Sequence, residues 1–98
     1  MTRAIFHPAA RRELEETVDR YDTEEQGLGR EFREEVQRVL ELLVLFPRLG
    51  QPVRGNIRRA VLSRFPYQDY YRLLDSGDLR VLAVAHHRRK PEYWVARQ

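Results

Sequence analysis

Residues 57–94, IRRAVLSRFPYQDYYRLLDSGDLRVLAVAHHRRKPEYW, are the part of this chain most informative about its fold. Three runs typical of strands follow one another there, at residues 57–62, 67–74 and 79–87. The third contains five consecutive apolar residues, Val81 to Ala85, and is therefore apolar on both faces. Such a run favours a strand in the middle of a sheet over a strand at its edge.

The connection between the last two runs predicts how they pair. Asp75-Ser76-Gly77-Asp78 is typical of a tight hairpin turn, in which Gly77 can adopt the left-handed conformation. The two strands should therefore be antiparallel. Side chains of the first run, residues 57–62, should point alternately to the two faces of the sheet, and one of these faces is partly basic.

The N-terminal half predicts one short strand and two helices. Residues 3–6 form a short apolar run, and Pro8 suits the first turn of a helix over about residues 8–22. After a break at Gly27 and Gly29, a second helix extends to about Phe46, where Pro47 ends it. Residues 47–56 contain two prolines and two glycines and are predicted to be a loop.

The predicted fold class is therefore α+β, in a single domain over residues 1–98. A short N-terminal strand and a helical hairpin precede a three-stranded antiparallel meander, which completes a curved sheet packed on the helices. The second helix ends in Leu42 to Phe46, which is apolar all round. Part of that end should pack in the core, and part should be free for a partner chain. The carboxylates of the first helix are interpreted as a solvated face.

Charge is distributed unevenly along the chain. The net charge is +3, but residues 1–50 hold 8 arginines against 11 acidic residues, whereas residues 51–98 hold 9 arginines and 1 lysine against 4 acidic residues. A basic half is typical of proteins that bind an anionic partner. There is no cysteine and no apolar run long enough to span a bilayer, so we expect a cytoplasmic protein without thiol-based metal sites.

Most enzymatic motifs are absent from the sequence. It has no glycine-rich phosphate loop, no HExxH motif and no plausible serine or cysteine nucleophile. His86 and His87 would point to opposite faces of a strand, so they should not share a metal ion. We expect neither a metal nor another cofactor.

The end of the third strand run is the most promising site. His87, Arg88, Arg89 and Lys90 could bind phosphate, while Tyr93 and Trp94 could stack on bases. Such a group could also cleave RNA without a metal, with histidine as acid or base and arginine holding the developing charge. In the alternative interpretation, the two aromatic residues fold back onto the core and the arginines face water.

Several stretches together resemble the RelE/ParE superfamily of type II toxins, specifically its ParE-like, plasmid-stabilisation branch. The stretch HPAARRELEETVDRY at residues 7–21 is similar to the opening helix of that family. The residues Arg58-Arg59 and the segment RFPYQDYYR at 64–72 resemble two of its strands. The ending LAVAHHRR at 82–89, followed by Pro91 and Tyr93-Trp94, resembles the end of ParE-like members.

This resemblance implies a small toxin that a cognate antitoxin neutralises in a toxin–antitoxin hetero-oligomer. ParE-like members act on DNA gyrase, and RelE-like members cut mRNA on the ribosome. A gyrase inhibitor would need no catalytic residues of its own. In the nucleolytic branch, Arg59 fits the family pattern, whereas Val61 and Gln68 stand where cations are expected. The absence of these two cations favours the ParE-like role. A non-toxic binding module that kept the fold is a third hypothesis.

Three sets of residues are expected to carry these functions. If the protein is a nuclease, the catalytic group would be Arg59, His87, Arg89 and Tyr93. The surface that binds the target would comprise Arg58, Arg59, Arg64, His87, Arg88, Arg89 and Trp94. The disordered end of the antitoxin would fold onto Leu14, Val18, Tyr21, Phe32, Leu45 and Phe46.

Overall fold

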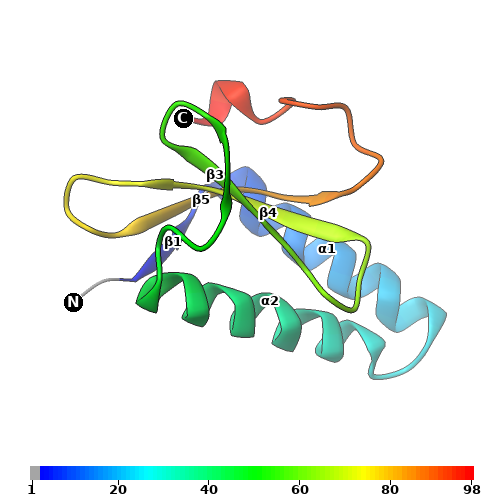
Figure 1. The fold of residues 1–98 in the computed structure, drawn as a ribbon. Helices are drawn as coiled ribbons and strands as arrows, with labels where there is room; N and C mark the ends of the chain where they lie inside the picture. The colour runs from blue at the N-terminus through cyan, green and yellow to red at the C-terminus, as the bar shows by residue number, and fades with distance from the viewer. Residues whose placement is uncertain (1–2) are drawn as a thin grey trace.

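Two helices cover one face of a five-stranded sheet, and the C-terminal segment lies on the other face (Figure 1). The structure, a computed structural model, describes residues 3–98. In chain order the elements are β1 (Ala4–Phe6), α1 (Pro8–Glu24), α2 (Leu28–Leu45), β2 (Gln51–Arg54), β3 (Ile57–Val61), β4 (Tyr67–Leu73), β5 (Leu79–His86) and a 3-10 turn (Val95–Arg97).

The order of strands in the sheet is β1-β5-β4-β3-β2. Strand β5 therefore lies inside the sheet, which confirms the prediction from its apolar run. It pairs in parallel with β1 and antiparallel with β4. Gly77 in the β4–β5 turn has a φ of 93°, the left-handed conformation expected there.

Strand β2 corrects the prediction that residues 47–56 are only a loop. It pairs antiparallel with β3, so the meander has four strands rather than three. Pro52 is tolerated because β2 is an edge strand, and the register shifts between Pro52 and Arg54. Gly55, at a φ of 55°, lies in the turn that returns the chain into β3. The two prolines and two glycines of residues 47–56 are typical of a loop, so the sequence did not indicate this short hairpin.

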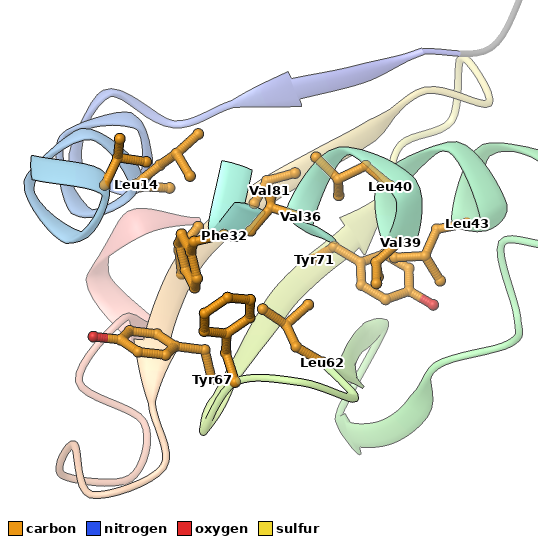
Figure 2. Close-up of a cluster of buried hydrophobic side chains, with 14 of the residues drawn as sticks. Leu14, Phe32, Val36, Val39, Leu40, Leu43, Leu62, Tyr67, Tyr71 and Val81 are labelled. Atoms are coloured by element: carbon orange, nitrogen blue, oxygen red, sulfur yellow. The ribbon is translucent and has the colours of Figure 1, made fainter. Parts of the chain in front are cut away.

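The main core lies between the helices and the sheet (Figure 2). Alternation along the strands and the helical stripes both direct apolar side chains into it. Phe32 of α2 is fully buried and contacts Phe65 and Tyr67 edge-on, with ring centroids 5.1 and 4.9 Å apart. The side chains labelled in Figure 2 converge there from both helices, from β4 and β5, and from the residue after β3: Leu14, Phe32, Val36, Val39, Leu40, Leu43, Leu62, Tyr67, Tyr71 and Val81.

The start of each helix is fixed by a local contact. His7 caps α1, because its Nδ1 accepts the backbone N–H of Ala9 at 3.0 Å. Gly29 lies against α1, and a Cβ there would collide with the backbone carbonyl of Val18 and the carboxyl group of Asp22. The two helices can therefore approach closely at their connection. Within residues 3–98, neither helix has the length and apolar character needed to cross a membrane.

Candidate functional site

A short basic loop follows β5 and is held by backbone contacts. The N–H of His87 donates to the carbonyl of Pro66 at 2.9 Å, and the N–H of Arg88 donates to Nδ1 of His86 at 3.0 Å. Arg88, Arg89 and Lys90 are exposed in this loop. The expected cluster of cations at the end of β5 is therefore present on the surface.

Trp94 does not belong to that exposed surface. Its relative accessibility is 0%, and its ring packs on Tyr70 with centroids 4.8 Å apart. It anchors a second core on the face of the sheet opposite the helices, with Ile57, Leu82, Ala83 and Ala85. We call this the outer face. The expectation that Trp94 offers its ring to a target is wrong, because the C-terminal segment folds back and buries it.

Glu13 of α1 holds the C-terminal segment in place. Its Oε2 accepts the Tyr93 hydroxyl at 2.8 Å, and its Oε1 accepts Nη1 of Arg97 at 2.9 Å. Oε1 also accepts the backbone N–H of Val84 at 3.0 Å. The sequence interpretation had placed the carboxylates of α1 in solvent, but the Glu13 side chain is only 13% exposed. The sequence indicated this burial only through the position of Glu13 beside Leu14, at the border of the apolar stripe of the helix.

The four residues of the nuclease hypothesis do not converge. Arg89 and Tyr93 do meet, with the guanidinium carbon of Arg89 3.8 Å from the ring centroid of Tyr93. The Tyr93 hydroxyl is occupied by Glu13, and burial, followed by that hydrogen bond, raises the pKa of Tyr93. His87 lies with Nε2 3.2 Å from the carbonyl oxygen of Tyr67. Arg59 is on β3, which β4 separates from β5.

A polar pocket of about 520 Å³ lies beside this loop, between α1 and the ends of β4 and β5. Arg20 donates to the Tyr67 hydroxyl on one side of it. His86 forms another part of the wall, and burial, then the neighbouring cations Arg88, His87 and Arg20, lower the pKa of His86. Carboxylates of α1 also face the pocket, so its charge is mixed. Among residues 3–98, no cluster of side chains is suited to hold a metal ion.

Arg58 and Arg64, the other expected target contacts, have partners within the protein. Arg58 Nη1 donates to the carbonyl of Gly50 at 2.7 Å, which ties β3 to the chain before β2. Arg64 Nη2 pairs with Oε1 of Glu31 at 2.7 Å but remains exposed. Neither residue lies in the loop with Arg88, so the expected target set is spread over several parts of the chain.

The residues expected to bind the antitoxin fall into two groups. Val18 and Phe32 have accessibilities of 7 and 0% and form the core, so their placement on a docking surface is wrong. Leu14 also belongs to the core, at 3%, but it lines the groove between β1 and α2. Their helical stripe faces the sheet, and the sequence could not distinguish a covered stripe from a free one. Leu45 and Phe46 are exposed by 71 and 59%.

Tyr21 is intermediate between these groups. It is partly exposed and packs against Phe32, Phe65 and Tyr67.

A groove of about 600 Å³ lies between β1 and α2, and Leu45 forms part of its wall. Leu42 and Leu49 extend the exposed apolar surface around Phe46.

Comparison with known proteins agrees with this geometry. One solved structure, described as the chromosomal ParDE TA system from P. aeruginosa, has 17% identity and a TM-score of 0.63, with 88% of this chain and 96% of that chain covered. The isolated E. coli RelE toxin has 18% identity and a TM-score of 0.59, with 98% and 95% covered. These similarities support the fold. None of the curated proteins matches the chain.

A family model settles the assignment. The model for the ParE toxin of the type II toxin–antitoxin system parDE matches residues 4–91, which includes every strand and both α-helices. The matched range also includes the basic loop that follows β5. The chain therefore belongs to the ParE toxin family.

Proposed function

We propose that this protein inhibits growth by binding DNA gyrase in the cytoplasm, and that a cognate antitoxin neutralises it. The observation that carries this proposal is the dispersal of the nuclease residues. Arg59 lies two strands away from β5, and the Tyr93 hydroxyl is bound to Glu13. General acid–base catalysis requires such groups to converge on one reacting phosphate. Inhibition by contact requires only a rigid complementary surface.

The basic loop is the proposed contact with the target. Arg88 and Lys90 are exposed and form no ion pair among the residues that the structure describes. The loop is fixed at both ends, by the contact between His87 and Pro66 and by the burial of Trp94. A preorganised loop loses little entropy on binding, which favours affinity.

The antitoxin is proposed to cover Leu45 and Phe46 and to continue along the groove between β1 and α2. Exposed apolar residues at one end of a helix are typical of a partner surface. An antitoxin segment that folds there would form a hetero-oligomer with the toxin.

The second candidate function is mRNA cleavage on the ribosome. The stacking of Arg89 on Tyr93 favours it, since both belong to the expected catalytic group. One experiment separates the two functions: the purified toxin is added to a gyrase supercoiling assay and, in parallel, to a translating extract with labelled mRNA. Loss of supercoiling with intact mRNA supports gyrase inhibition. Rapid mRNA cleavage with unaffected supercoiling would instead support the nuclease, and inactivity in both assays, together with unchanged growth on expression, would support a non-toxic binding module.

A further inference from the structure

Three arginines gather on the outer face of the sheet, away from the basic loop. Arg72 of β4 is directly opposite Arg80 of β5, and Ile57 of β3 is directly opposite Arg72. Directly opposite residues direct their side chains to the same face. Because Ile57 belongs to the second core, Arg72 and Arg80 also lie on the outer face.

Arg59 completes this group. It is directly opposite Tyr70, another member of the second core, and is therefore on the outer face and diagonal to Arg72. We name Arg59, Arg72 and Arg80 the arginine triangle. All three side chains are partly buried on rigid strands, so their positions are determined by the register of the sheet.

The arginine triangle lacks the counter-ions that would make it a structural network. Within residues 3–98, none of the three forms an ion pair, and Arg59 donates to a neutral side chain, Gln51. The Nε atoms of Arg59 and Arg72 are buried and have no hydrogen-bond partner in this described part of the chain. Like charges placed opposite one another destabilise a sheet, and a buried donor without a partner costs free energy. An external anion bound at the guanidinium groups would offset the repulsion between them.

More positive charge lies at the β1 end of the same region. Burial, and then the guanidinium groups of Arg80, Arg97 and Arg12, lower the pKa of His7, against a smaller opposing effect of Glu13. Asp78, an acidic side chain of the β4–β5 turn, accepts the backbone N–H of Arg3 at 3.1 Å. Three arginines and one carboxylate therefore surround His7, and Arg97 is the arginine that pairs with this carboxylate, Glu13.

We infer that the arginine triangle binds the phosphate backbone of nucleic acid, with duplex DNA as the proposed ligand. The planar guanidinium group matches a phosphate in a bidentate geometry. A protein partner would require apolar anchors at the centre of its interface. The aromatic residues beside the triangle, Tyr70 and Trp94, are buried, whereas Leu45 and Phe46 belong to α2 and its end. This inference goes beyond the proposed function, because phosphate binding requires no gyrase.

The test is fluorescence anisotropy with a short labelled duplex of mixed sequence and the purified protein, over a series of salt concentrations. Arg72→Gln and Arg80→Gln should each weaken binding several-fold and reduce the slope of log K against log salt by about 0.9 for each phosphate that is no longer neutralised. Arg30→Gln is the matched control, since Arg30 is an exposed arginine on α2 that pairs with Glu34. It should leave both quantities close to wild type.

A charge-conserving variant and a competition experiment distinguish the remaining explanations. Arg72→Lys retains the charge and should keep the salt slope, although it cannot form the bidentate hydrogen bonds. If Arg72→Gln does not fold, Arg80→Gln and Arg72→Lys provide the comparison. Equal affinities and slopes for the Arg72, Arg80 and Arg30 variants would overturn the inference. Displacement of the duplex by polyglutamate at equal charge concentration would also overturn it, in favour of an acidic peptide. Gyrase is absent from these assays, so their outcome is independent of the supercoiling result.

Discussion

The carboxylate of Glu13 on α1 accepts the backbone N–H of Val84 on β5 at 3.0 Å. Strand β1 pairs with β5 only over residues 79–81, so the edge of β5 is uncovered beyond that point. Glu13 satisfies the amide of Val84 there, and Arg97 donates to the carbonyl of Leu82 at 3.1 Å. Two side chains thus take the place of a strand. An open strand edge invites pairing with other chains, and this arrangement blocks it.

Glu13→Gln should destabilise the fold by about 2–3 kcal/mol, because it removes a charge-assisted bond to Arg97 that is largely shielded from water. Tyr93→Phe should cost about 1 kcal/mol, since it removes a single hydrogen bond. Urea unfolding measures both free energies. The double variant should be destabilised by less than the sum of the two single effects, because both act on the same carboxylate. Glu16→Gln, at an exposed position of α1, is the control and should be close to neutral.

Asp69→Asn should alter the pH dependence of stability. Asp69 is fully buried, neither of its carboxyl oxygens has a hydrogen-bond partner among residues 3–98, and burial raises the pKa of Asp69 to about 8. In the unfolded chain the pKa of an aspartate is about 4. The folded state therefore holds a proton that the unfolded state loses, so stability falls as the pH rises from about 4 to about 8.

Urea midpoints of wild type and Asp69→Asn at about pH 5 and about pH 8 check this assignment. The wild type should lose stability between these two pH values by more than the variant does. The difference between the two proteins removes the contributions of other titrating groups. Parallel pH profiles would mean that Asp69 keeps its ordinary pKa in the folded protein.

Trp94→Ala should destabilise the protein by about 3–5 kcal/mol, because it leaves a large cavity in the second core. Trp94→Phe retains most of the packing and should cost less. Trp94 is the single tryptophan of the chain, so its fluorescence reports this site directly. Native protein should emit at short wavelength and shift to longer wavelength on unfolding. A native spectrum typical of hydrated indole would contradict the burial of Trp94.

Phe46→Ser should weaken binding of the cognate antitoxin by at least about tenfold, because an aromatic anchor contributes about 2 kcal/mol or more. Stability should change by no more than about 0.5 kcal/mol, since Phe46 is exposed. Calorimetric titration with the antitoxin measures the affinity. Val61→Ser, at a similarly exposed residue on β3, is the control and should bind normally. Equal weakening by both variants would place the antitoxin elsewhere.

The order and type of most elements followed from local chemistry. The apolar run of β5 predicted a central strand, and Gly77 predicted the β4–β5 turn, because both depend on residues close together in the chain. The short strand β2 was missed, since an edge position tolerates Pro52 and leaves no periodic signal in four exposed residues.

The site depended on contacts between distant residues. Tyr93 and Glu13 are 80 positions apart, and the local sequence around either residue does not predict that they interact. The same path of the chain buries Trp94, which local sequence presents as an aromatic residue beside a basic block.

Local sequence is sufficient to specify a helical hairpin and an antiparallel meander with a cationic C-terminal half. Periodicity, prolines and glycines act within a few residues, and the sum of charges does not depend on folding. The folded chain shows which apolar residues remain exposed, which carboxylate holds the C-terminal segment and which arginines meet on one face, and local sequence does not. Those outcomes depend on strand register and on the packing of segments that are remote in the chain.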